Sequence, residues 1–236
     1  MKTEKKFTLV ELIVVVTIVA IIATIKMSMP STAKEMVKNT KCNDNIRQLL
    51  YGYQTYASDN SGWLRPATLT THSSSCWIFD IRNYIYKNAV SGGPTIVANM
   101  DKWACFYCPA EITNVEQCTY GHYVLNAYGL GTPDSQTGWT PPKYVARQEN
   151  NLLDPSLVSV FFDSARIGYD ENGKSKNHHS IDYVSSNYIG YKHHIAATPS
   201  CTNVGFYDGH VQLLSKDKIG SNKNFLLEGI SMINGK

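Results

Sequence analysis

Six cysteines and seven histidines are the residues of this chain best suited to chemistry. Four of them follow the spacing Cys105-x2-Cys108-x9-Cys118-x3-His122. Thiolates and an imidazole at such intervals are typical ligands of tetrahedral zinc, so the spacing predicts a zinc site. The same cysteines can instead pair as disulfides, and if all six are paired there are fifteen connectivities. The pattern alone leaves both uses open.

Further histidines stand in the adjacent pairs His178-His179 and His193-His194, and His210 follows Asp208 by two residues. Clusters of His and Asp are typical of metal sites and of hydrolases. Neighbouring residues of a strand point to opposite faces, however, so one pair rarely gives two ligands to one ion. The sequence also lacks the usual hydrolase, zinc-protease and phosphate-binding motifs, and residues 170–173 form only a fragment of a calcium loop. We therefore expect no enzymatic activity and no cofactor, with zinc or calcium as the alternative.

Composition indicates a globular protein. Of 236 residues, 43% are hydrophobic and 17% are charged, which is enough apolar material for a core. The 22 Lys and Arg exceed the 19 Asp and Glu by only three, too thin an excess for a dedicated nucleic-acid binder. The mean hydropathy of −0.24 excludes a polytopic membrane protein.

One segment departs from this average. From Phe7 to Ile25 the chain is apolar except for Glu11 and three threonines. A helix of this length spans about 28 Å, close to the ~30 Å hydrocarbon core of a bilayer. The preceding MKTEKK carries three lysines against one glutamate, which favours a cytoplasmic N-terminus. A cleaved signal peptide is the alternative, but residues 26–30 show no small-x-small cleavage site. We expect a single-pass anchor.

Glu11 is the one residue of this segment that needs a partner. A carboxylate at the middle of a bilayer costs roughly 2.5 to 3.5 kcal/mol. Glu11 lies near the start of the segment, so its side chain can reach cytoplasmic water or pair with Lys5 or Lys6. A charge supplied by another molecule is the other solution.

The run of lysines, Phe7-Thr8-Leu9-Val10-Glu11-Leu12 and an apolar helix resembles the type IV prepilin leader of type IV pilins and type II secretion pseudopilins. The resemblance implies that a prepilin peptidase cleaves between Lys6 and Phe7 and N-methylates Phe7. It also implies that Glu11 of one subunit pairs with the α-ammonium of Phe7 on a neighbour in a filament. Lys6 is a departure, because the family normally has Gly before the cut.

Other stretches resemble a subgroup of bacterial pseudopilin-like proteins. They are Cys42 to Pro66 with its Cys-x-x-Asn, the Phe-x-Cys-Pro at Phe106 to Pro109, SVFFDS at Ser159 to Ser164, and the closing NVGFYDGHVQLL. The last predicts a hairpin on its own residues, because apolar Val204 to Tyr207 precede an Asp208-Gly209 turn and an alternating strand.

The expected fold class is α+β: a long N-terminal helix on an antiparallel β-sheet. Apolar residues at spacings of three and four extend the helix to about residue 57, Pro30 kinks it, and residues 58–62 end it. Long loop insertions fall at 88–99 and 129–143. The organisation is a leader at 1–6, the transmembrane half of the helix at 7–29, and an exported domain at 30–236. For an exported domain, one or two disulfides suit the cysteines better than zinc.

The function that these features predict is a non-enzymatic pseudopilin that assembles into a type II secretion pseudopilus or a type IV pilus-like filament. The implied partners are copies of itself, other pilin-like subunits, the prepilin peptidase, the assembly platform and the inner membrane, with no nucleic acid. The globular domain would be periplasmic or in an extracellular filament. The alternative is a single-pass anchored enzyme, or a metal- or glycan-binding protein, that uses the same leader.

Overall fold

The structure is a computed structural model that describes residues 8–27, 31–66, 77–86, 104–110, 121–126, 130, 148–164, 180–181, 189–191, 193–195 and 198–219. Its helices are α1 (Leu9–Met27), α2 (Ser31–Asp59), α3 (Trp77–Ile85), η3 (Ala104–Phe106), η5 (Glu149–Asn151) and α5 (Lys216–Ile219). Its strands are β1 (Tyr123–Asn126), β2 (Ser159–Asp163), β3 (Ser180–Ile181), β4 (His193–Ile195), β5 (Thr198–Phe206) and β6 (Val211–Ser215).

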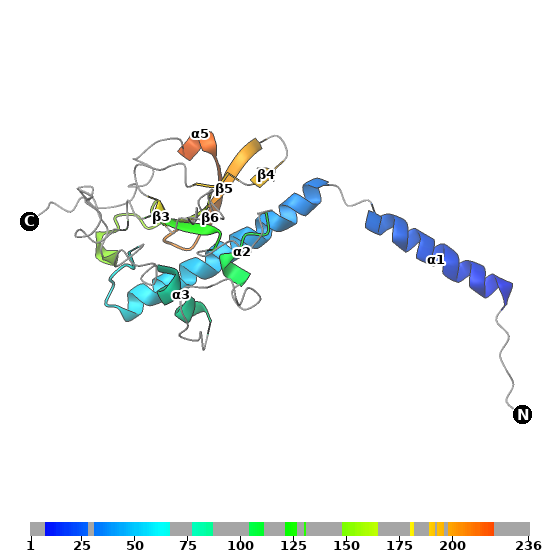
Figure 1. Ribbon diagram of the computed structural model, residues 1–236, viewed down its shortest axis with the longest axis horizontal. Helices are drawn as coiled ribbons and strands as arrows, with labels where there is room; N and C mark the ends of the chain where they lie inside the picture. Colours follow the sequence, from blue (N-terminus) through cyan, green and yellow to red (C-terminus); the bar gives the residue numbers. More distant parts are fainter. Residues whose placement is uncertain are drawn as a thin grey trace, which may run out of the picture.

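The N-terminal part is described as two helices, so the one continuous helix that the sequence predicts is not established among the described residues. Helix α1 stands apart from the globular part, whereas α2 runs along it as a long rod (Figure 1). Residues 28–30, including Pro30, lie outside the described residues, as does the leader at 1–6. Within the described part of the chain, no helix combines the length and the apolarity needed to cross a membrane.

Helix α2 ends where the sequence predicts a stop. Ser61 and Gly62 have positive φ angles of 57° and 78°. The N–H of Gly62 donates to the carbonyl of Ala57 at 2.8 Å, which is the wide hydrogen bond of a Schellman motif. This turn redirects the chain, so that Trp63 forms a bridge with Gln148.

The sheet has six strands in the order β3-β1-β2-β5-β4, with β6 on β5. Every pairing is antiparallel except that of β1 with β3, which is parallel and departs from the all-antiparallel expectation. Strand β5 organises the sheet, because β6 follows one of its edges from residue 201 to residue 205. Strands β2 and β4 share the other edge, β2 opposite residues 204–206 and β4 opposite residues 198–201.

The predicted hairpin is confirmed at the end of the sheet. Strands β5 and β6 flank Asp208-Gly209, and Gly209 has a φ of 96°. The N–H of Phe206 donates to the carbonyl of His210 at 2.9 Å, which closes the turn. Glycine adopts this left-handed conformation without the penalty of a Cβ atom.

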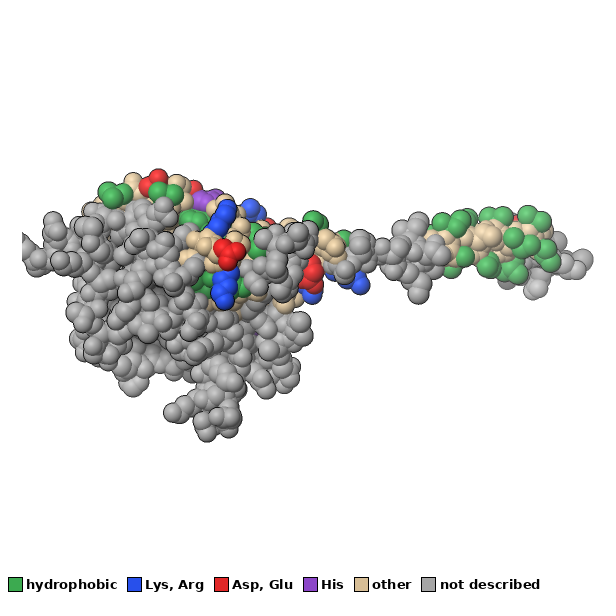
Figure 2. Space-filling view, turned by 90° about the horizontal axis from the view of Figure 1, so that it is seen from above, with side chains coloured by type: hydrophobic (Ala, Val, Ile, Leu, Met, Phe, Trp, Pro, Cys, Tyr) green, Lys and Arg blue, Asp and Glu red, His purple; other side chains and the backbone are tan. Residues whose placement is uncertain are grey.

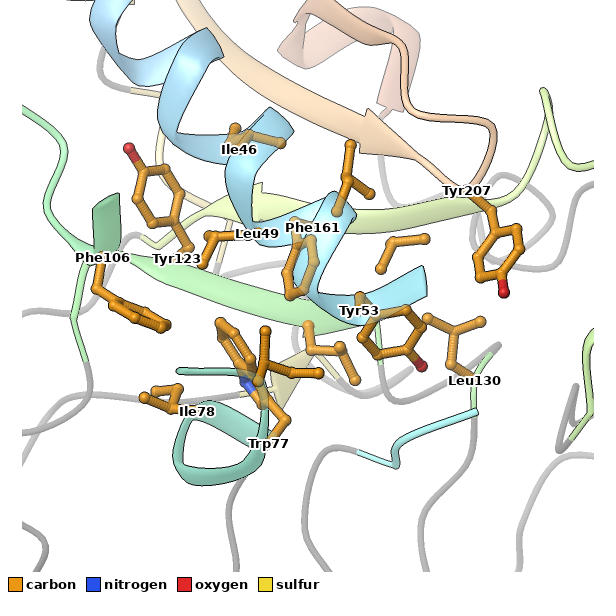
Figure 3. Packing of buried hydrophobic residues seen from close by; sticks show 14 of the residues in the cluster. Ile46, Leu49, Tyr53, Trp77, Ile78, Phe106, Tyr123, Leu130, Phe161 and Tyr207 are labelled. Atoms are coloured by element: carbon orange, nitrogen blue, oxygen red, sulfur yellow. The ribbon is translucent and has the colours of Figure 1, made fainter. Parts of the chain in front are cut away.

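The core lies between α2, the sheet and α3. Figure 3 shows Ile46, Leu49 and Tyr53 of α2 in one layer with Phe161 of the sheet and Trp77 of α3. Helix and sheet approach closely at Gly205, where an added Cβ would lie 2.4 Å from Ile46 Cγ2. The α+β class is therefore confirmed for the described residues, with α2 as the helix on the sheet. The predicted insertion at 88–99, and that at 129–143 apart from Leu130, lie outside them.

Candidate functional site

One face of α2 holds the segment 104–110 by a covalent bond and by hydrogen bonds. Cys42 and Cys108 form a disulfide, with their Cα atoms 5.2 Å apart and a sequence separation of 66. Asn45, one turn later on the same face, donates from Nδ2 to the carbonyl of Tyr107 at 2.7 Å and to Tyr123 Oη at 3.2 Å. The Cys-x-x-Asn pattern thus anchors this segment to the helix.

His122 fixes the backbone of Cys108 from the other side. The N–H of Cys108 donates to Nδ1 of His122 at 3.1 Å, and the N–H of His122 donates to the carbonyl of Phe106 at 2.8 Å. Gly121 makes this approach possible, because a Cβ there would lie 2.7 Å from the carbonyl oxygen of Phe106. His122 therefore positions the loop through its backbone.

Asp163 and His193 meet in the interior because of the way in which β2 and β4 share the edge of β5. Asp163 ends β2 and His193 begins β4, so the two residues face each other across the gap between these strands. His193 Nε2 lies 3.3 Å from Asp163 Oδ2 and 3.7 Å from Cys108 Sγ. Both side chains are buried.

These contacts define a cluster of four buried residues, which we call the Cys–Asp–His cluster: Cys42, Cys108, Asp163 and His193. One donor atom of each residue lies within 4.8 Å of the donor atoms of the others. The four residues come from α2, the segment 104–110, β2 and β4, so the fold itself assembles them.

The two oxygens of Asp163 differ in their surroundings. Oδ2 accepts the backbone N–H of Asn203 at 2.8 Å and the hydroxyl of Thr202 at 3.4 Å. Oδ1 is also buried, and within the described residues it meets no hydrogen-bond donor. A buried carboxylate oxygen without a partner is unfavourable unless another ligand occupies it.

The zinc set predicted from spacing is not brought together among the described residues. Cys108 is bonded to Cys42, and Cys118 lies outside the described residues. Cys105 is a free buried thiol, so the disulfide expected among these cysteines joins Cys108 to Cys42 and leaves Cys105 out. Burial raises the pKa of the Cys105 thiol to about 12, so it is protonated at neutral pH. Cys108 bonds to helix α2 instead of joining the predicted zinc set, because Cys42 and Asn45 lie on the helix face that contacts the segment 104–110.

Glu11 has a local role that the sequence analysis did not consider. Its Oε2 accepts the backbone N–H and the hydroxyl of Thr8, each at 2.8 Å, and its own N–H donates to Thr8 Oγ1 at 3.3 Å. This is a capping box at the start of α1, and the Thr-x-x-Glu spacing signals it in sequence. Lys6 and Phe7, the predicted processing residues, lie outside the described residues.

The other histidines do not join the Cys–Asp–His cluster within the described structure. His210 Nδ1 lies 2.6 Å from Asp208 Oδ1, and its ring stacks on Phe206 with centroids 4.3 Å apart at the exposed end of the hairpin. His178, His179 and residues 170–173 lie outside the described residues, and nothing is described of the side chain of His194. The expectation that such a pair rarely gives two ligands to one ion therefore stays a prediction for His193 and His194.

Sequence reasoning missed Cys42, Asp163 and His193 as one group. Their positions in the chain are far apart, so spacing carries no signal for them. The available signal was Asp163 itself, an acid at the end of the otherwise apolar strand SVFFD. Comparison of the chain with protein-family models, with curated protein sequences and with solved structures found no match.

Proposed function

We propose that this protein is a non-enzymatic structural subunit of the pilin type, processed before Phe7 and assembled into a type II secretion pseudopilus or a type IV pilus-like filament. Residues 7–29 would anchor it in the inner membrane with a cytoplasmic N-terminus. The globular domain would lie in the periplasm or in an extracellular filament. The observation that carries this proposal is the exposed apolar surface of α1.

Helix α1 has no polar face. Between Leu9 and Ile22 its large hydrophobic side chains are 49% to 74% exposed. Figure 2 shows these side chains along the visible face of the helix, separate from the globular part. Apolar surface gains about 25 cal/mol per Å² on leaving water, so a surface of this kind needs a cover. Lipid before assembly and neighbouring helices after assembly would provide it.

Glu11 would then have a second partner besides Thr8. Both bonds from Thr8 go to Oε2, and within the described residues Oε1 accepts no hydrogen bond. In the proposed filament, Oε1 accepts the α-ammonium of a neighbouring subunit's Phe7. Such a pair offsets the desolvation of both charges in the apolar interior of a helix bundle.

The arrangement of α2 supports a rod that ends in a globular head. We propose that α1 and α2 form one helix in the filament, kinked at Pro30 and extending to the Schellman turn at Ser61 and Gly62. From Cys42 onward, α2 is fixed by the bond from Cys42 to Cys108 and by packing on β5 at Gly205. The subunit would interact with copies of itself, other pilin-like subunits, the prepilin peptidase and the assembly platform.

Two measurements test the proposal in host cells. Mass spectrometry of the N-terminal peptide should find a chain that begins at methylated Phe7. Glu11→Ala should leave the protein in the membrane fraction but remove it from sheared filaments or crosslinked multimers. An intact N-terminus on a chain that is never polymeric would contradict the proposal. It would favour an anchored metal- or glycan-binding protein or enzyme.

A further inference from the structure

We propose that Cys42, Cys108, Asp163 and His193 form a zinc site when the disulfide between Cys42 and Cys108 is reduced. The disulfide is then the metal-free, oxidised form of the same cluster. This inference rests on the geometry of the globular domain and is independent of filament assembly.

The donor types and their distances fit tetrahedral zinc. Zinc in proteins is bound by Cys, His and Asp at about 2.0 to 2.3 Å, and a tetrahedron with such arms has edges of roughly 3.3 to 3.8 Å. His193 Nε2 already lies 3.3 Å from Asp163 Oδ2 and 3.7 Å from Cys108 Sγ. The donor atoms of all four residues lie within 4.8 Å of one another, so small shifts bring the set to this size once reduction lets the two sulfurs move apart.

Asp163 is arranged as a ligand with supported geometry. Its Oδ2 is fixed by the N–H of Asn203 and the hydroxyl of Thr202, as is common for ligating carboxylates in metal sites. Its Oδ1 is buried and has no hydrogen-bond donor among the described residues. A zinc ion bound by Oδ2, the oxygen 3.3 Å from His193 Nε2, would also lie close to Oδ1 of the same carboxylate and compensate its charge.

The charge of the cluster also requires a cation if both sulfurs are to bind as thiolates. Within the described residues the one ion-pair partner of Asp163 is His193. Two thiolates next to a buried carboxylate would place three negative charges together, which is strongly unfavourable without compensation. Zn²⁺ neutralises two of these charges, and a neutral imidazole completes the four ligands.

The redox step balances with an external dithiol. Two electrons from the dithiol break the S–S bond, and its two protons convert Cys42 and Cys108 to thiols. The external dithiol is itself oxidised to a disulfide. Zinc then binds the two sulfurs and displaces these protons to solvent. An external disulfide reverses the process: it takes two electrons from the bound thiolates and two protons from solvent to become a dithiol, the bond between Cys42 and Cys108 forms again, and Zn²⁺ is released.

The test uses the full chain in detergent, freed of metal with a chelator and divided into oxidised and phosphine-reduced samples. Each sample receives Zn²⁺, and bound zinc is measured after desalting without oxygen. The expected result is about one Zn²⁺ per reduced chain and none at this site in the oxidised chain. Reduced protein that binds no zinc, or oxidised protein that binds it equally, overturns the proposal.

Variants then locate the site. His193→Ala should abolish stoichiometric binding, whereas His210→Ala, which removes an exposed His beside an Asp on the same sheet, should retain it. Cys118→Ser should also retain it, while a site at Cys105, Cys108, Cys118 and His122 would lose it. Circular dichroism shows whether each variant folds. If His193→Ala does not fold, the absorption spectrum of Co²⁺ bound to the reduced wild type is the test. Two thiolate-to-cobalt charge-transfer bands with tetrahedral d–d bands support the site, and an octahedral spectrum refutes it.

Discussion

Asp163 Oδ2 and His193 Nε2 lie 3.3 Å apart in the interior, although the strands that carry them do not pair with each other. Each strand pairs instead with β5, and their ends meet along its edge. The contact therefore depends on the register of both strands. A slip of one residue in either strand would turn one side chain to the opposite face and break the contact.

The first prediction concerns this buried pair in the oxidised protein. Asp163→Ala should lower the free energy of unfolding by about 3 kcal/mol or more, because it leaves buried donors of Asn203, Thr202 and His193 without an acceptor. Asp163→Asn keeps one oxygen acceptor and should cost less. Guanidinium denaturation of both variants measures the difference. Equal losses would show that the amide oxygen of Asn cannot replace the carboxylate, and would contradict a role for these neutral hydrogen bonds in stability.

The second prediction concerns the disulfide. Cys42→Ser should destabilise the domain by about 2 to 4 kcal/mol, because the bridge closes a long loop and restricts the unfolded chain. Cys201→Ser is the control, since Cys201 is a buried cysteine of β5 that lies outside this bridge. Reduction of wild type without zinc should have the same effect as Cys42→Ser. A peptide map without reductant that lacks the linked Cys42 and Cys108 peptides would refute the pairing.

The third prediction concerns the contact between α2 and the sheet. Gly205→Ala places a Cβ 2.4 Å from Ile46 Cγ2 and should cost about 1 to 3 kcal/mol through overpacking. In an Ile46→Ala background the same change should cost much less, because the clashing methyl group is gone. Melting temperatures of the two single variants and the double variant measure this coupling. Additive losses would mean that Gly205 is required for another reason.

The fourth prediction is a pH dependence that arises from Cys105. Burial raises the pKa of its thiol from 9.0 to about 12 in the folded chain. Below pH 9 the thiol is protonated in both states, so its contribution to stability is fully present there. Between pH 9 and 12 only the unfolded chain loses the proton, so stability falls as the pH rises.

Cys105→Ala should reduce the slope of the unfolding free energy against pH by the contribution of one titrating proton. Chemical denaturation at several pH values between 9 and 12 compares the variant with wild type. Buried tyrosines such as Tyr53 and Tyr123 also have a raised pKa and act in the same direction. The difference between the two proteins isolates the thiol, and identical slopes would contradict the buried environment of Cys105.

The fifth prediction separates the two roles of Glu11. Glu11→Gln keeps a side chain that can accept from Thr8 but removes the charge, whereas Thr8→Val breaks the cap and keeps the charge. If intermolecular charge pairing governs assembly, Glu11→Gln should block filaments and Thr8→Val should still assemble. The reverse result would assign the role of Glu11 to helix capping. Western blots of sheared filaments and of membrane fractions provide the measurement.

Local features could be predicted from the sequence, since neighbouring residues determine them. The Asp208-Gly209 hairpin requires only a positive φ at the turn and alternating strands beside it, and the stop after α2 requires only Ser61 and Gly62. The α+β class follows from such elements. The parallel pairing of β1 with β3 could not be predicted, because their sequences are compatible with either direction.

The Cys–Asp–His cluster could not be predicted for a related reason. Cys42 could have paired with any other cysteine, and only the fold brings it to Cys108. Asp163 and His193 come together through the shared edge of β5, which no spacing in the chain records. Close sequence spacing instead predicted Cys105 as a zinc ligand. Its backbone N–H donates to Tyr86 Oη at 3.1 Å, and its thiol is buried and takes no part in the disulfide.

The position of Cys42 along α2 has a mechanical consequence. From Thr32 to Lys41 no residue of the helix is fully buried, so Cys42 is its first fully buried residue and its covalent attachment to the domain. Tension applied to the helix from its N-terminal end reaches a covalent bond before it reaches the packing of Ile46 and Leu49. The load would pass into the segment 104–110, and the helix would resist peeling away from the sheet for as long as that bond is intact.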